Sequence, residues 1–169
     1  QSAAQSYFKF QHDSIQQAAS ALVPDTDKPA LQLKIGRLLW ADTLLTDDLG
    51  ERVFDIVNLF NGGYTLIIDE TEKELLARLN WLAGKKAKEG TAYQTATNYL
   101  ALGIQLLSET AWDKHYEMAF ALHKEQGECE FLCGQFKNSE QLLAIALVKA
   151  RSKFDKANIY VIKLAQLST

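Results

Sequence analysis

Residues 75–103 read LLARLNWLAGKKAKEGTAYQTATNYLALG, and the spacing of apolar side chains in this stretch decides the fold. Leu75, Leu79 and Leu82 recur every three or four residues, which is the spacing of one buried face of a helix. The same spacing recurs along the chain, from Leu31 to the last residues. We therefore expect an all-α protein.

Short breaks divide the helical pattern into about eight segments. The breaks fall at residues 23–28, 46–49, 61–71, 88–91, 108–110 and 134–138, and around Ser152. Helices joined by such short connections pack against each other as antiparallel hairpins. Two runs are strand-like instead, Tyr7–Gln11 and Tyr64–Ile68, and the second is equally compatible with an extended connector.

An internal repeat begins within the opening stretch. Five positions recur 43 residues later with the same or a similar residue type. The pairs are Gly84 and Gly127, Tyr93 and Phe136, Ala96 and Ser139, Leu100 and Leu143, and Gly103 and Ala146. Small residues at such positions let two helices approach closely, and the aromatic residue fills the wedge between them.

The paired positions are those of the tetratricopeptide repeat, which the chain resembles. The resemblance implies a tetratricopeptide-like α-solenoid over residues 69–169. Three features depart from the usual pattern. Asn80 and His123 stand where Trp is usual, and Glu130 stands where Tyr is usual. The spacing of 43 residues also exceeds the usual period of about 34.

The composition is that of an ordinary globular chain. Of the 169 residues, 47% are hydrophobic and 23% are charged, which is enough apolar material for a sizeable core. The net charge is −3 and the basic residues are scattered, which argues against nucleic acid as a partner. We expect a cytoplasmic location without membrane contact, because the sequence has neither a membrane-spanning apolar run nor a signal peptide. Since the chain begins at Gln1, we expect a segment of a longer protein.

The stretch Phe8–Leu39 resembles the end of the ATPase region in the large multidomain signalling kinases of cyanobacteria and related bacteria. Those proteins join a serine/threonine kinase, a STAND (AAA-type) ATPase, a helical-repeat segment, a GAF domain and a histidine kinase. The matching residues are Phe8, Phe10, His12, Asp13, Gln16 to Ala19, Leu22, Pro24, Leu31 and Ile35 to Leu39. Further matches at residues 54–58, 77–80, 83–84, 86–88, 92–93, 112, 116–117 and 134–136 extend the resemblance over nearly the whole chain.

The resemblance implies three regions. Residues 1–24 would be the truncated end of a winged-helix, ATPase-associated region, residues 25–68 a helical connector, and residues 69–169 the tetratricopeptide-like repeats. It also implies a noncatalytic segment of a two-component signal-transduction kinase, which relays the state of a nucleotide switch through protein–protein or interdomain contacts.

The motifs of catalysis are absent from this sequence. It contains no GxxxxGK[ST] phosphate-binding loop and no HRD or DFG kinase motif. We therefore expect no catalytic residue, cofactor or metal in this chain. The full-length protein that the resemblance implies would have protein kinase and ATPase activity.

His12, followed by Asp13, is the strongest candidate for chemistry. A His before an acidic residue is how the phosphoacceptor helix of a histidine kinase begins, and the resemblance also implies a phosphate contact from His12. A histidine phosphotransfer module that uses His12 or His115 is therefore an alternative function. A structural role is favoured, because Asp13 suits a helix N-terminus and His12 can pack or bond a backbone carbonyl.

Cys129, Cys133 and His123 could together suggest a metal site. Zinc normally takes four ligands from two elements, and a fourth ligand is not evident, so two reduced core thiols are favoured. A group of glutamates nearby could suggest acid/base chemistry, but no partner can be placed beside it from the sequence, and we expect a solvated face. These glutamates are Glu125, Glu128 and Glu130.

Arg78, Trp81, Lys85 and Lys88 fall close to one helical stripe. In the tetratricopeptide alignment they line the concave surface, where such repeats hold extended peptides or neighbouring domains. They form a candidate interaction surface for a protein or for an adjacent domain of the same chain. The alternative is that Trp81 belongs to the core and the cations are solvated. A dimerisation element, which would bury the apolar faces of terminal repeats in a homodimer, is a further alternative function.

Overall fold

The computed structural model describes residues 23–46 and 49–167. In this part of the chain eight α-helices and one short 3₁₀ helix follow one another, with no strand, and the expected all-α class is confirmed. The helices are α2 (Lys28–Thr46), α3 (Leu49–Gly62), η1 (Tyr64–Leu66), α4 (Glu70–Glu89), α5 (Tyr93–Gln105), α6 (Ala111–Lys114), α7 (Tyr116–Leu132), α8 (Phe136–Lys149) and α9 (Lys153–Leu167). No helix of the described residues is long and apolar enough to span a membrane.

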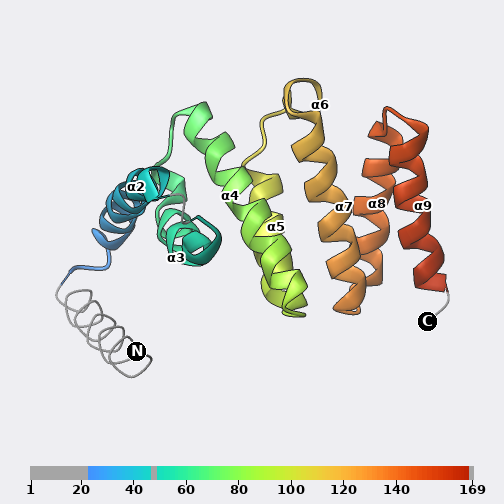
Figure 1. The fold of residues 1–169 in the computed structure, drawn as a ribbon, viewed down its shortest axis with the longest axis horizontal. Coiled ribbons are helices and arrows are strands. Elements are labelled where there is room, and N and C mark those ends of the chain that lie inside the picture. Colours follow the sequence, from blue (N-terminus) through green and yellow to red (C-terminus); the bar gives the residue numbers. More distant parts are fainter. Residues whose placement is uncertain (1–22, 47–48, 168–169) are drawn as a thin grey trace.

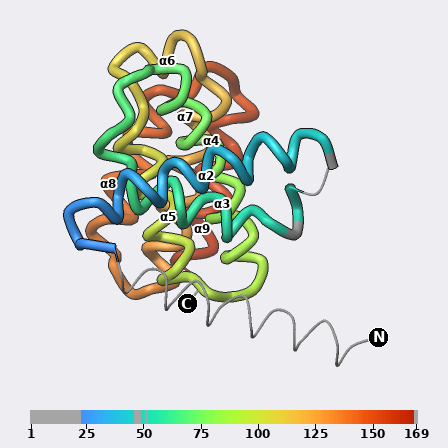
Figure 2. The backbone as a smooth tube through the Cα atoms, turned by 90° about the vertical axis from the view of Figure 1, so that its left-hand side faces the viewer, coloured from blue at the N-terminus to red at the C-terminus, as the bar shows by residue number. Residues whose placement is uncertain are grey.

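The helices form an array that runs along the long axis of the molecule (Figure 1). Consecutive helices pack as the pairs α2–α3, α4–α5 and α7–α8, and α9 packs on α8 and α7. Helix α7 also contacts α4 and α5, which joins the two middle pairs. Helix α2 crosses the N-terminal end of the array (Figure 2).

Helix α4 shows why these segments begin and end where they do. Asp69 precedes its first turn and accepts a hydrogen bond of 2.9 Å from the backbone N–H of Glu72, which caps the helix. Acidic residues occupy its first turn, and Lys86 and Lys88 occupy its last turn, so both ends suit the helix dipole. The chain then turns at Thr91, which has a φ of 59°.

Each of the two middle pairs contains the same kind of close contact, between a glycine on one helix and a leucine on the other. A Cβ on Gly84 would lie 2.6 Å from Cγ of Leu100, and a Cβ on Gly127 would lie 2.8 Å from Cγ of Leu143. Each leucine therefore occupies the space that the missing side chain leaves on the facing helix. Two of the pairs that the sequence aligned across 43 residues, Gly84 with Gly127 and Leu100 with Leu143, thus make the same contact in α4–α5 and in α7–α8.

A third glycine joins the two pairs to each other. A Cβ on Gly103 of α5 would lie 2.7 Å from Cδ2 of Leu122 on α7. Ala146, which the repeat places opposite Gly103, is buried in a cluster with Ile159 of α9.

The structure corrects two details of the predicted pattern. The strand-like run Tyr64–Ile68 begins as the 3₁₀ helix η1, closed by a hydrogen bond of 3.1 Å from Ile67 N to Tyr64 O. Ile67 enters the core and Ile68 is 88% exposed, an alternation that a strand would also show, so the apolar pattern alone could not separate the two structures. The break at 108–110 is followed by the short helix α6 and a second break at His115, which the sequence did not indicate.

The predicted winged-helix fragment lies mostly outside the described residues, which begin at Val23. The predicted connector, residues 25–68, contains α2, α3 and η1. It is tied to the repeats by Arg37 of α2, whose guanidinium donates two hydrogen bonds of 2.6 and 2.7 Å to the carboxylate of Glu72 on α4. A fork of this kind fixes orientation because both donors and both acceptors must align.

Candidate interaction surface

All four predicted surface residues lie on α4, and the first three have no ion pair with another helix among the described residues. Arg78 is exposed, and Trp81 is partly buried. The ammonium of Lys85 lies 5.3 Å from the centre of the Trp81 ring, within the range of a cation–π interaction. These residues form a cationic surface with an aromatic centre, which we call the α4 surface.

Trp81 combines the two roles that the sequence left open. Its ring packs against a buried cluster that includes Ala96 and Leu100 of α5. Its Nε1 is covered and has no hydrogen-bond partner within the part of the chain that the structure describes. The residue therefore contributes to the core on one side and supports Lys85 on the other.

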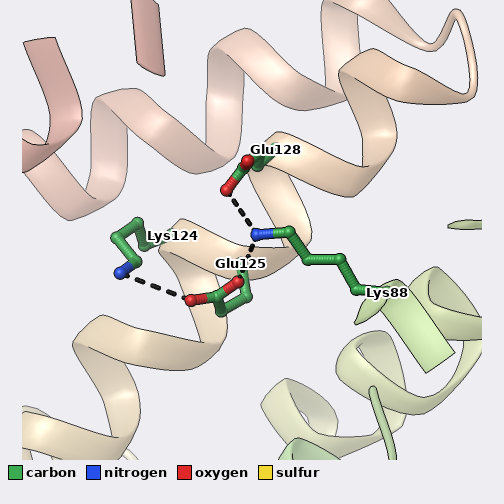
Figure 3. A network of polar contacts seen from close by, with 4 residues as sticks. All are labelled: Lys88, Lys124, Glu125 and Glu128. Atoms are coloured by element: carbon green, nitrogen blue, oxygen red, sulfur yellow. Dashed lines mark hydrogen bonds and ion pairs between the residues drawn. The ribbon is translucent and has the colours of Figure 1, made fainter. Parts of the chain in front are cut away.

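Lys88, the fourth predicted residue, has a different position. Its Nζ lies 2.6 Å from Oε2 of Glu125 and 2.6 Å from Oε2 of Glu128, both on α7 (Figure 3). Lys124 contacts the other oxygen of Glu125 at 3.3 Å. The ammonium of Lys88 thus bridges α4 and α7. A contact of this residue with a partner stays a prediction.

The same contacts correct the prediction of a solvated acidic face. Glu125 has a side chain that is only 13% exposed, and that of Glu128 is 34% exposed. A carboxylate this close to the core needs a cation beside it, and Lys88 provides one. The signal in the sequence was the three-residue spacing, which places Glu125 and Glu128 on one side of a helix. What the sequence lacked was the neighbouring helix that carries the lysine.

The network favours the charged forms of both partners. Burial opposes the charge on Lys88, but the hydrogen bonds that it donates to Glu125 and Glu128 outweigh burial and raise the pKa of Lys88. Burial also opposes the charge on Glu125, but its hydrogen bond with Lys88 outweighs burial and lowers the pKa of Glu125. Lys88 and Glu125 are therefore both ionised at neutral pH.

The cysteines and His123 occupy separate environments. Cys129 is buried, and burial raises the pKa of its thiol to about 12. His123 donates from Nδ1 to the carbonyl of Ala119 at 2.8 Å and packs on Trp112 with ring centres 4.9 Å apart. Burial lowers the pKa of His123, so the ring is neutral. The described residues contain no group of three or more His, Cys, Asp or Glu side chains that could hold a metal ion.

Of the two candidate phosphoacceptors, only His115 lies within the described residues. It forms the bend between α6 and α7, and its Nε2 is 2.9 Å from Oε1 of Glu74 on α4. The side chain is 37% exposed, so solvent reaches part of it. His12 lies outside the described residues.

A comparison with known proteins gives this array a context. The chain is 32% identical, over 167 aligned residues, to the hybrid signal transduction histidine kinase G of Dictyostelium discoideum. The chain is a helical segment related to a signal-transduction kinase. The match covers 85% of this chain but only 5% of the length of that kinase. No family model matches the chain, and no solved structure matches it.

Proposed function

We propose that this chain is a noncatalytic, tetratricopeptide-like segment of a cytoplasmic multidomain signalling kinase. In this role it transmits the state of a nucleotide-switch domain through contacts with neighbouring domains or proteins. The observation that carries the proposal is the match to a histidine kinase, which covers most of this chain and a small part of the kinase. A segment of that size with repeated helix pairs suits a connecting arm.

The packing of the array supports a mechanical role. The pairs α4–α5 and α7–α8 each contain a close contact between a glycine and a leucine, and α7 joins the two pairs through contacts with both α4 and α5. In arrays of this kind each unit contacts only its neighbours, so a force or rotation applied at one end passes through successive interfaces. The bridge from Lys88 to Glu125 and Glu128 stiffens one of these interfaces.

The α4 surface is the proposed contact for a partner. Arg78 and Lys85 supply positive charge, and Trp81 supplies an apolar, aromatic centre. Arginine and tryptophan are enriched at the energetic centres of protein interfaces, and cations favour a partner with carboxylates. The proposed partner is therefore an acidic segment of a protein, either a separate chain or an adjacent domain of the same one.

The noncatalytic part of the proposal is tested by calorimetry. The chain is titrated with ATP and Mg²⁺, and no binding heat is expected at micromolar protein concentration. The same protein incubated with γ-labelled ATP is expected to stay unlabelled. Saturable ATP binding or self-phosphorylation would contradict the assignment to a noncatalytic segment.

The proposed contact is tested by site-specific photocrosslinking in the full-length parent protein. A photoreactive amino acid replaces Lys85 on α4, and the matched control replaces Lys149, an exposed lysine on α8. Crosslinks from position 85 to an acidic segment of another domain or protein are expected, with few from position 149. Equal yields at both positions, or none at position 85, would count against the α4 surface.

Histidine phosphotransfer remains the second candidate, because the His115 side chain is partly exposed. The hydrogen-bonding distance to Glu74 means that Nε2 is engaged within the array, which favours a structural role. Incubation with a phosphorylated histidine kinase, followed by mapping of acid-labile phosphate, separates the two functions. Phosphate on His115 or His12 would establish the transfer module, and a chain without label would remove it.

A further inference from the structure

Helix α2 has two opposite faces of different character. One face is packed: Leu33, Gly36 and Thr43 are buried, and a Cβ on Gly36 would lie 2.9 Å from the ring of Phe60 on α3. The opposite face carries Leu31, Leu38 and Leu45, which are 38%, 64% and 87% exposed. We call these three residues the leucine stripe. It lies on the helix that crosses the N-terminal end of the array (Figure 2).

The spacing of the leucine stripe fits a helical partner. Its members are seven residues apart, and a seven-residue step returns a side chain to within about 20° of the same side of an α-helix. Apolar residues repeated in this way form the seam along which two helices pack. A soluble helix that exposes three such leucines has a strong hydrophobic reason to acquire a partner.

The leucine stripe is symmetric about its centre, so it fits a second copy of itself. Leu31 lies seven residues before Leu38, and Leu45 lies seven residues after it. If two α2 helices pack antiparallel with Leu38 against Leu38 of a second copy, Leu31 of each chain faces Leu45 of the other. A surface that matches itself in this way is what a two-fold symmetric dimer requires.

Charge selects the antiparallel arrangement over the parallel one. Lys34 lies four residues before Leu38, and Asp42 lies four residues after it. Antiparallel pairing brings Lys34 of one copy level with Asp42 of the other, twice in each dimer. Parallel pairing would instead set Lys34 against Lys34 and Asp42 against Asp42. Asp42 also accepts a hydrogen bond of 2.6 Å from Arg52 in its own chain, and a carboxylate accommodates more than one donor.

We propose that two copies of this chain form an antiparallel, two-fold symmetric dimer through the leucine stripe of α2. The dimer would place the two arrays on either side of a shared N-terminal interface. Its formation does not depend on the α4 surface or on the proposed relay function, because α2 provides all of the contacts. A failure of the dimer would therefore leave the proposed function untouched, and the reverse also holds.

The first test measures molar mass by light scattering across protein concentration. The full chain, of 18.9 kDa, is expected to approach twice that mass as its concentration rises. Leu38→Glu is expected to weaken dimerisation at least about 100-fold, because the dimer would bury two opposed carboxylates. The matched control is Leu164→Glu on α9, where the leucine is 63% exposed, and it is expected to leave the dimer intact.

Three results of this test would overturn the proposal. They are a chain that stays monomeric at all concentrations, a dimer that resists Leu38→Glu, and a dimer that Leu164→Glu abolishes. Circular dichroism of both variants verifies that the helices are retained. Both substitutions lie at exposed positions, so loss of the fold is not expected.

The second test reads the register by cysteine crosslinking with copper phenanthroline, in a Cys133→Ser background that keeps the buried Cys129. Leu38→Cys is expected to crosslink with itself across the two-fold axis. Leu31→Cys and Leu45→Cys are expected to crosslink when mixed with each other and not when alone. Efficient self-crosslinking at all three positions would indicate parallel pairing, and no crosslink at position 38 would exclude the proposed axis.

Discussion

The charge states of single ionisable residues depend on how closely the helices of this array pack around them. Lys88 and Glu125 stay charged in a partly buried position because each stabilises the other. His123, which is 7% exposed, stays neutral because burial disfavours its charged form and no described residue offers it an opposite charge. The charged pair and the neutral histidine therefore affect the free energy of unfolding in different ranges of pH.

The first prediction concerns His123. Its pKa in the folded chain is lowered by burial from the ordinary value of 6.5, so the unfolded chain binds the proton more readily. The stability contribution is thus present above pH 6.5 and is lost as the pH falls below it. The free energy of unfolding in urea should drop between about pH 7.5 and 5.5, and His123→Gln should flatten that slope. An unchanged slope in the variant would assign the effect to other groups.

By the same reasoning, Lys88 and Glu125 stabilise the folded chain over a wider range of pH than His123 does. The lowered pKa of Glu125 means that its contribution is present above 4.5 and is lost as the pH falls through the folded-state value. The raised pKa of Lys88 means that its contribution is present below 10.5 and is lost as the pH rises through the folded-state value. The bridge between α4 and α7 therefore persists across the whole neutral range.

The second prediction uses the two thiols. Cys129 is buried with a pKa of about 12, whereas Cys133 is partly exposed at the end of α7. Because only a thiolate reacts quickly, iodoacetamide at neutral pH should label Cys133 in the folded chain and both cysteines in denaturant. Mass spectrometry of the labelled peptides measures the order. Equal labelling of both thiols in the native chain would show that α7 opens readily at its C-terminal end.

At the scale of helices, the packing depends on glycines. A leucine from the facing helix occupies the space where a side chain at each glycine would lie. The third prediction is that Gly84→Ala and Gly127→Ala each destabilise the protein by about 1–3 kcal/mol, because the added methyl group meets Leu100 or Leu143 at less than van der Waals distance. Urea unfolding measures the change. Similar losses at the two sites are expected because the two contacts are alike.

Gly90→Ala is the matched control for these substitutions. Gly90 follows α4 with a φ of −81°, and a Cβ there would have no neighbour closer than 3.5 Å. Its replacement should change the free energy of unfolding by less than about 0.5 kcal/mol. If Gly84→Ala were equally neutral, the helices would not be held as closely as the glycine contact indicates.

Helix boundaries show what local sequence could indicate. The Asp69 cap and the charged turns of α4 act within a few residues of each other, so the pattern located that helix well. The bend at His115 arises differently. Nε2 of its ring lies 2.9 Å from Oε1 of Glu74 on α4, a residue 41 positions earlier. The local spacing of residues does not indicate that contact.

For the molecule as a whole, stability should fall toward the C-terminal end. Helix α9 has a single buried residue, Ile159, whereas α4 and α7 each bury a row of side chains. The fourth prediction is that backbone amides of α9 exchange with deuterium at least about tenfold faster than those of α4 and α7. Hydrogen exchange followed by mass spectrometry measures this gradient. Uniform protection would show instead that the array opens as one cooperative unit.

The candidate site was only partly predictable for a related reason. Arg78, Trp81 and Lys85 share one helix, so their proximity follows from helical spacing alone. Lys88 shares that spacing, yet its ammonium is held by two glutamates about forty residues away. Its role depends on how α7 lies against α4.

The sequence by itself determined the helical class, most helix positions and the paired glycines and leucines of the two middle hairpins, because each depends on short spacings or on an internal repeat of residue types. Only the tertiary structure decided that Lys88 joins two helices and that the 64–68 run turns as a 3₁₀ helix. It also decided which face of α2 stays exposed. These features depend on which helices meet, and that is settled by packing across the whole array.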